Sequence, residues 1–192
     1  MYKGASYERG GEDKSGVLNE HFLFGDITSG RNSQRYLDEL SSALKARTVS
    51  GGKSTYLGYE EAMRLAIRSQ VDTPEQPKRL FMKDLRLAIE GVFKIAFHGK
   101  QFSVKIYSAI GTPLDIYHGV DAFVEIEDEM KKRTTITFDV TLDELKKMTD
   151  GMKADVMIGI LPDPQDEEKQ YRSTLQHIAN DVLVQYRARV GR

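Results

Sequence analysis

Three segments in the second half of the chain alternate apolar and polar residues with a period of two. They run over about 102–109, 121–127 and 134–140, and three even-numbered positions in each are apolar. Because side chains alternate across a strand, the pattern predicts three strands that bury one face and expose the other, as in an antiparallel meander. A fourth segment, 155–161, is apolar on every side and predicts an inner strand that is buried on both faces.

Helical periodicity frames these strands. Apolar residues spaced by three and four predict a long amphipathic helix over about Leu80 to Phe97. Thr141 followed by Glu144 forms a capping box, which predicts a helix that crosses over to the fourth strand. A final helix is predicted over about 169–189. The fold class is therefore α/β, with a mixed sheet flanked by helices.

The first third of the chain predicts a helical extension to this core. Residues 1 to about 16 are rich in glycine, serine and mixed charge, which indicates loose packing. Helices are predicted over about 33–47 and 59–69. The apolar face of the first is formed by Tyr36, Leu37, Leu40, Ala43 and Leu44. Two prolines in the following linker mark a boundary, so we divide the chain into a flexible and helical part, 1–77, and an α/β core with a C-terminal helix, 78–192.

Composition narrows the class of protein. With 192 residues, of which 40% are hydrophobic and 30% charged, the chain predicts one globular domain with enough apolar material for a core. No apolar stretch is long enough to span a bilayer, so no membrane association is expected. The absence of cysteine excludes disulfides and thiolate zinc sites and fits a reducing compartment, so we expect a cytoplasmic protein.

Charge is nearly balanced overall but unevenly distributed. The net charge of −1 gives no bulk attraction for nucleic acid. Residues 78–105 nevertheless carry seven lysines and arginines against two acidic residues, whereas 121–168 is strongly acidic. This asymmetry allows a basic face beside an acidic pocket, although solvated surface charge without a partner explains it equally well.

Two aspartates stand at the ends of predicted strands, a structure in which aspartate is depleted. Asp121 opens the second strand and Asp139 closes the third, and both occupy polar positions of the alternation. If these strands pair, both carboxylates project from the same face of the sheet. Mg²⁺ and Mn²⁺ favour such oxygen ligands, together with water and phosphate. The pattern indicates a divalent-metal site; the plainer alternative is two solvent-exposed strand ends.

The order helix, three strands, helix, strand, with "GVDAF" on the second strand and "FDVT" on the third, resembles the restriction-endonuclease-like (PD-(D/E)xK) nuclease superfamily. The resemblance covers about Leu80 to Pro162 and implies an α-β-β-β-α-β core that hydrolyses nucleic-acid phosphodiesters with Mg²⁺ or Mn²⁺. It implies Asp121 and Asp139 as catalytic metal ligands and Glu90, on the preceding helix, as a further metal ligand. Nucleic acid is the implied partner, DNA more than RNA, and a homo-oligomer is left open.

One position departs from the superfamily. The family's lysine belongs two residues after the second acid, and Thr141 stands there. Some members carry this lysine on the following helix, where helical geometry favours Lys146 as the catalytic lysine. Glu90 has an alternative as well, because it lies four residues before Lys94, an ion-pair spacing. The missing strand lysine favours a catalytically inactive nuclease-fold module that binds nucleic acid or a protein partner, and a structural or assembly protein is also left open.

Overall fold

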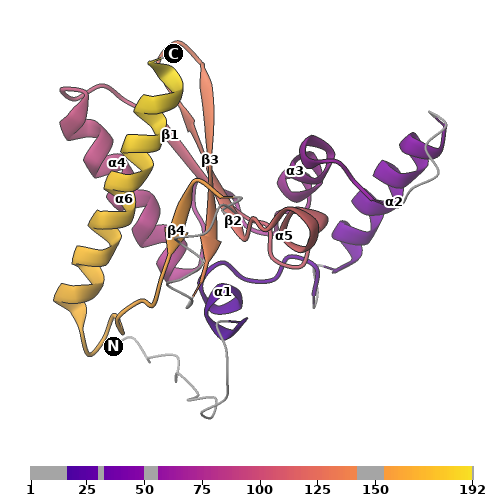
Figure 1. The fold of residues 1–192 in the computed structure, drawn as a ribbon, viewed down its shortest axis with the longest axis horizontal. Coiled ribbons are helices and arrows are strands. Elements are labelled where there is room, and N and C mark those ends of the chain that lie inside the picture. Colours follow the sequence, from indigo (N-terminus) through magenta and orange to yellow (C-terminus); the bar gives the residue numbers. More distant parts are fainter. Residues whose placement is uncertain (1–16, 30–32, 50–55, 142–153, 192) are drawn as a thin grey trace.

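A four-stranded mixed sheet with helices on both faces forms the centre of the molecule (Figure 1). The structure is a computed structural model, and it describes residues 17–29, 33–49, 56–141 and 154–191. Its strands are β1 (Ser103–Ser108), β2 (Ala122–Glu127), β3 (Arg133–Val140) and β4 (Val156–Ile158), and they lie in this order across the sheet. The first three form the predicted antiparallel meander, and β4 pairs with β3 in parallel.

The fourth strand differs from the prediction. β4 is shorter than the predicted segment and, in the part of the chain that the structure describes, lies at an edge of the sheet. Val156 and Ile158 belong to the hydrophobic cluster under α6 (Glu168–Val190), whereas Met157 is only half-buried and Ile160 is 73% exposed. The expectation of an inner strand was therefore wrong, because the apolar run reflects packing against one helix rather than two covered faces.

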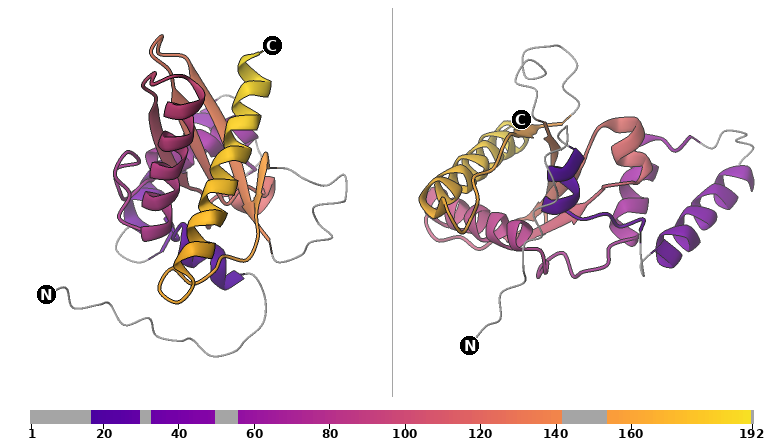
Figure 2. Two further views of the ribbon diagram at one scale, coloured as in Figure 1. Left: turned by 90° about the vertical axis from the view of Figure 1, so that its left-hand side faces the viewer. Right: turned by 90° about the horizontal axis from the view of Figure 1, so that it is seen from below.

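The even-numbered residues of β1–β3 form one face of the sheet, which we call the even face. The helices α4 (Leu80–Ala96) and α6 lie side by side over it, as Figures 1 and 2 show. Both helices were predicted within two residues of their observed ends. Phe93 is fully buried there, and its ring centroid lies 5.2 Å from that of Phe102 and 5.0 Å from that of Tyr186. A continuous apolar layer therefore separates the sheet from these two helices.

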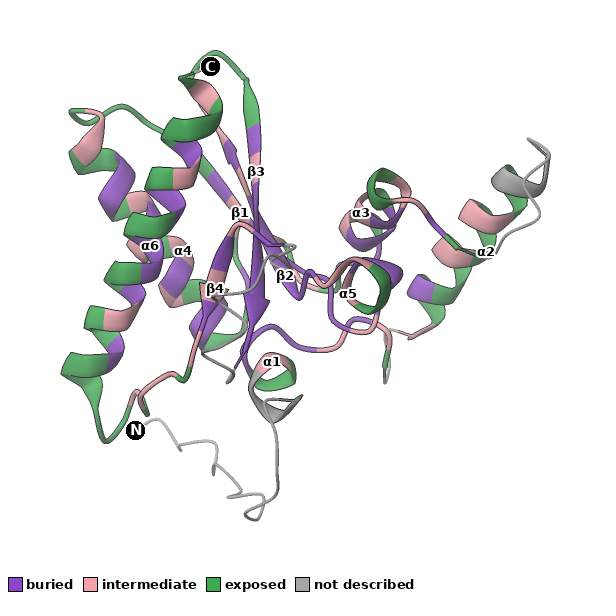
Figure 3. Ribbon diagram, viewed as in Figure 1, coloured by how far each residue is buried: buried purple, intermediate pink, exposed green. Residues whose placement is uncertain are grey.

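The opposite, odd face is covered over only part of its area. There α3 (Tyr59–Arg68) and α5 (Pro113–His118) pack on the sheet, and buried segments of both helices face it (Figure 3). The rings of Tyr107 and Phe123 stack there, with their centroids 4.8 Å apart. Towards the other end of the strands Lys105 and Glu125 are partly exposed. The expected solvent-exposed face is thus confirmed for one end only, because a second hydrophobic cluster covers the other.

The helices before residue 77 contribute to both clusters. Leu23 and Phe24, at the end of α1 (Val17–Leu23), pack with the even-face residues. The predicted helix over 33–47 is α2 (Ser33–Val49), which contacts α3 and buries Tyr36. Leu37, predicted on its apolar face, is 51% exposed, so the buried stripe is narrower than expected. The boundary at residue 77 stays a prediction, since each cluster combines residues from both sides of it.

The proline-containing linker runs along the outer edge of the sheet. The carbonyl oxygen of Pro74 accepts a hydrogen bond from the amide of Ile106 in β1 at 3.1 Å. The ammonium of Lys105 also lies 2.7 Å from a carboxylate oxygen of Glu75. This linker therefore occupies hydrogen-bonding positions of β1 that face away from β2.

Two helices were not predicted from the sequence, α1 and α5. Thr112 caps α5 by accepting a hydrogen bond from the amide of Leu114 at 3.2 Å, and Gly119 ends it with a φ of 63°. The helix predicted to follow Thr141 lies outside the described residues. Within the described ranges, no helix has the length and apolar character needed to cross a membrane.

Candidate functional site

The register of β2 and β3 brings the two predicted carboxylates together. Ala122 pairs with Phe138, so one step further Asp121 stands opposite Asp139. The amide of Asp121 donates to the carbonyl oxygen of Phe138 at 2.9 Å, which shows that the strands are still joined at this point. Because Ala122 and Phe138 belong to the even-face cluster, alternation assigns both aspartates to the odd face.

Asp121 is held in an environment that opposes its ionisation. Only 4% of the residue is exposed, and its Oδ2 accepts a hydrogen bond from the amide of Val140 at 2.6 Å. The pKa of Asp121 is raised to about 7, mainly by burial; the nearby carboxylates of Glu20, Asp139 and Asp115 contribute to this rise, and the hydrogen bond from the Val140 amide opposes it. Asp121 therefore changes charge near neutral pH.

Asp139 is 6% exposed and is supported by the strand around it. Two residues before it, Thr137 donates from both its amide and its hydroxyl to Oδ2 of Asp155, each at 2.8 Å. The other oxygen of Asp155 accepts a hydrogen bond from Arg189 of α6 at 2.5 Å. This arrangement ties the start of β4 and the end of α6 to β3, next to the position of Asp139.

A third carboxylate, Asp115, reaches the same region from α5. Its Oδ2 accepts a hydrogen bond from the amide of Gly111 at 2.8 Å. Burial raises the pKa of Asp115, and the charges of Asp139 and Asp26 act in the same direction. We call Asp115, Asp121 and Asp139 the carboxylate corner. Sequence reasoning missed Asp115, although the pair Thr112–Pro113 is a helix-start signal that would have placed it on a helix before Asp121.

The other two predicted site residues do not join this corner in the described structure. Glu90 lies on α4, which covers the even face, and it forms an ion pair with Arg86 rather than with the predicted Lys94. Lys146 lies outside the described residues. Thr141, where the resemblance implied a lysine, is buried, and its amide donates to the carbonyl oxygen of Ile158 at 2.9 Å.

A divalent cation fits the chemistry of the corner. The raised pKa values of Asp115 and Asp121 mark negative charge that burial leaves without a full counter-charge, and a cation would stabilise their ionised forms. Mg²⁺ is bound in proteins through one or two carboxylates, water and substrate phosphates. Among the residues that the structure describes, no three histidine, aspartate or glutamate side chains are grouped so that they alone could hold a metal ion.

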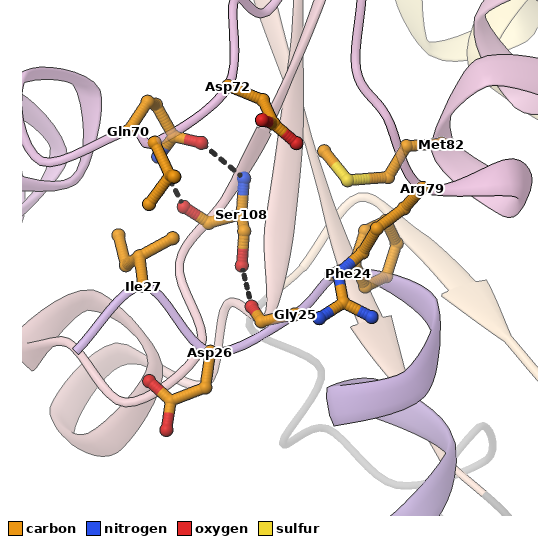
Figure 4. A pocket seen from close by; sticks show the side chains of 10 residues that line it. Phe24, Gly25, Asp26, Ile27, Gln70, Asp72, Arg79, Met82 and Ser108 are labelled. Carbon is orange, nitrogen blue, oxygen red and sulfur yellow. Dashed lines mark hydrogen bonds between the residues drawn. The ribbon is translucent and has the colours of Figure 1, made fainter. Parts of the chain in front are cut away.

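A small cavity of about 140 Å³ lies beside β1, where the loop after α1 meets the end of α3 and the start of α4 (Figure 4). Ser108 connects its walls: its amide donates to Oε1 of Gln70 at 3.1 Å, and its hydroxyl donates to the carbonyl oxygen of Gly25 at 2.6 Å. Asp26 turns its carboxylate away from Arg79 and Asp72, and it accepts hydrogen bonds from the amide and hydroxyl of Thr28 instead. These bonds fit a structural junction.

Comparisons with known proteins add no further assignment. Scans against protein-family models, curated proteins and solved structures found no match to this chain. The candidate site therefore rests on the residues and geometry described above.

Proposed function

We propose that the chain is a divalent-metal-dependent nuclease with a restriction-endonuclease-like (PD-(D/E)xK) core. The observation that carries the proposal is the opposed pair of buried carboxylates, Asp121 and Asp139, at the end of β2 and β3. The sheet order β1-β2-β3-β4 after α4 supports it, because β1–β3 are antiparallel and β4 is parallel to β3; α5 is an additional helix between β1 and β2. The proposed reaction is hydrolysis of nucleic-acid phosphodiesters.

In this proposal Asp121 and Asp139 hold Mg²⁺ or Mn²⁺. The bound ion supplies charge stabilisation on the phosphate and activates a water molecule for attack. The chain itself contributes ionised carboxylates at and above neutral pH, since the pKa of Asp121 is about 7. Asp155 and Arg189 keep the strand that carries Asp139 in position. Lys146 is proposed to bring the positive charge that Thr141 cannot provide.

The proposed substrate is nucleic acid, DNA more than RNA, on the basis of the resemblance. The basic segment 78–105 gives no separate support, because Lys78, Arg86 and Lys105 each pair with a carboxylate. The proposal also includes a homo-oligomer, which a measurement of molar mass in solution tests.

The test is a cleavage assay with plasmid DNA, linear DNA and RNA, in Mg²⁺ or Mn²⁺ and in EDTA. We expect metal-dependent cleavage that falls on the order of a hundredfold or more in Asp139→Asn, because a charged ligand is lost while the shape is kept. Asp181→Asn, at an exposed position on α6, is the matched control and should keep full activity. Lys146→Ala should also cost about a hundredfold or more, and Lys147→Ala should cost little. Full activity of Asp139→Asn, or no metal-dependent cleavage by the wild type, would contradict the proposal.

A second candidate is a catalytically inactive module of the same fold that binds nucleic acid or a protein. Two observations favour it. Thr141 is buried and hydrogen-bonded to β4 where the superfamily has a lysine. Asp121 accepts a hydrogen bond from the amide of Val140, which is a structural task at a strand end. Binding of labelled nucleic acid without cleavage in either metal would favour this candidate.

A further inference from the structure

An aromatic surface lies next to the carboxylate corner. Tyr56, Tyr59 and Tyr117 are 44%, 45% and 49% exposed, and together with His118 they form what we call the tyrosine patch. The centroid of the Tyr56 ring lies 5.4 Å from that of Tyr117 and 5.6 Å from that of His118. The rings of Tyr59 and His118 are nearly perpendicular, with their centroids 5.5 Å apart. These rings come from the segment that leads into α3, the first residue of α3 and the end of α5.

The patch is held in place by the buried structure beneath it. Nε2 of His118 lies within hydrogen-bond distance, 3.1 Å, of the carbonyl oxygen of Leu57, a fully buried residue. Interplanar angles of 51–89° between the rings keep them tilted, so the patch offers separate ring faces and edges rather than one flat apolar surface. The fold therefore presents these rings in a fixed arrangement at little cost in side-chain entropy on binding.

Two connections join the patch to the carboxylate corner. The helix α5 carries both Asp115 and the residues Tyr117 and His118, and the chain reaches Asp121 only three residues after His118. Burial raises the pKa of Tyr59, the charge of Asp155 adds to this effect and that of Arg189 opposes it. Tyr59 therefore lies within electrostatic range of the pair that supports Asp139.

We propose that the tyrosine patch binds unpaired bases of a nucleic-acid strand by stacking, beside the carboxylate corner. Tyrosine ring faces suit this ligand because every base has a flat π-face, which makes stacking tolerant of sequence. The bases inside a duplex are already stacked on one another, so a single strand or an extruded base is the form that the patch accepts. The inference deepens the proposed function, on which it rests, by naming the form of the substrate.

The test measures binding without cleavage. A labelled thymidine oligonucleotide, single-stranded or annealed to its complement, is titrated with the full chain in EDTA and followed by fluorescence anisotropy. We expect the single strand to bind more tightly than the duplex. Tyr117→Leu should raise Kd by about tenfold, the loss expected for one stacked base, whereas Tyr117→Phe keeps the aromatic face and should stay within about twofold of the wild type. Ile95→Ala, on the far layer and 80% exposed at this position, should leave Kd unchanged.

A second readout comes from the composition of the chain. Because the chain contains no tryptophan, its intrinsic emission comes from tyrosine. Stacking should quench part of this emission when the single strand is added, and Tyr117→Phe should lose part of the quenching while keeping its affinity. Circular dichroism checks that the variants are folded.

Three results would overturn the inference: no binding of the single strand by the wild type, equal Kd values for wild type and Tyr117→Leu, or a dimer that Tyr117→Leu converts to monomer with unchanged nucleic-acid affinity. The last would identify the patch as a protein interface. Metal-dependent cleavage that needs Asp139 but not the tyrosines would support the proposed function and contradict the stacking inference. Tyrosine-dependent binding without any cleavage would support the stacking inference and contradict the proposed nuclease activity.

Discussion

The two faces of the same three strands bury different kinds of side chain. On the even face, apolar side chains such as Val124 and Phe138 are fully buried against α4 and α6. On the odd face, at the end of the same strands, Asp121 and Asp139 are almost as deeply buried. One face gains stability from every buried residue, whereas the other keeps ionisable groups where burial disfavours their charge.

This difference shows that the odd face is less favourable for stability than the even face at positions 121 and 139. Apolar residues at positions 121 and 139 would extend the hydrophobic cluster that already contains Phe123 and Val120. A buried carboxylate with a raised pKa instead destabilises the fold once it ionises. Departures of this kind from the rules of core packing concentrate at functional sites, which is why the odd face carries the proposed function.

The largest expected effect on stability comes from a substitution in the hydrophobic layer on the even face. Phe93→Ala should lower the free energy of unfolding by about 3–5 kcal/mol, because it removes a buried ring and leaves a cavity among Phe97, Phe102 and Tyr186. Chemical denaturation measures the loss. Ile95→Ala on the exposed side of the same helix is the control and should change stability by less than about 0.5 kcal/mol. Equal losses for the two variants would contradict the arrangement of α4.

The second prediction concerns pH and the odd face. Below pH of about 4, Asp121 is protonated in both the folded and the unfolded chain. Between this value and the folded-state pKa of about 7, the unfolded chain ionises first, so the contribution of Asp121 to stability is lost as the pH rises. Asp121→Asn removes this dependence and can still accept the Val140 hydrogen bond. It should therefore be more stable than the wild type at pH 8, by up to roughly 4 kcal/mol.

Denaturation curves of both proteins across this pH range check the prediction. Adding Mg²⁺ at pH 8 should raise the melting temperature of the wild type and not that of Asp121→Asn, because a ligand that binds the folded state stabilises it. Parallel stability profiles for the two proteins would show that Asp121 ionises normally in the fold.

The smallest expected effect on stability concerns the N-terminal cap of α5, the helix that carries Asp115 to the odd face. Thr112→Ala removes the hydroxyl that accepts the Leu114 amide and should cost about 1 kcal/mol of stability. Thr112→Ser keeps this hydroxyl and should lose less. Thermal melting compares the two, and a Thr112→Ala variant as stable as the wild type would show that the cap contributes nothing.

Much of the sheet could be predicted because the strands obey one simple rule. The period-two alternation placed β1, β2 and β3 within about one residue of their ends, and the same parity indicated that Asp121 and Asp139 share a face. This reasoning succeeds because the two aspartates lie on neighbouring strands joined by a short turn, so local pattern and local register determine their relation.

The rest depended on contacts between distant segments. α5 has only six residues, too few for helical periodicity, and it is held by Thr112 and Gly119 at its ends. Glu20 approaches Asp121 from a helix about a hundred residues earlier, which no local pattern reveals. The assignment of β4 as an inner strand failed because an apolar run does not tell how many of its sides are covered.

The contact between Pro74 and β1 has a consequence for solubility. An open strand edge offers unpaired amides and carbonyls to the edges of other molecules, which is a common route to aggregation. Here the amide of Ile106 is already bonded to the carbonyl of Pro74, and Lys105 and Glu75 place charges on the same border. At the opposite border β4 is only three residues long, and a short strand is a poor template for pairing. The linker before α4 therefore covers the exposed edge of β1 and disfavours pairing of this edge with a strand of another molecule.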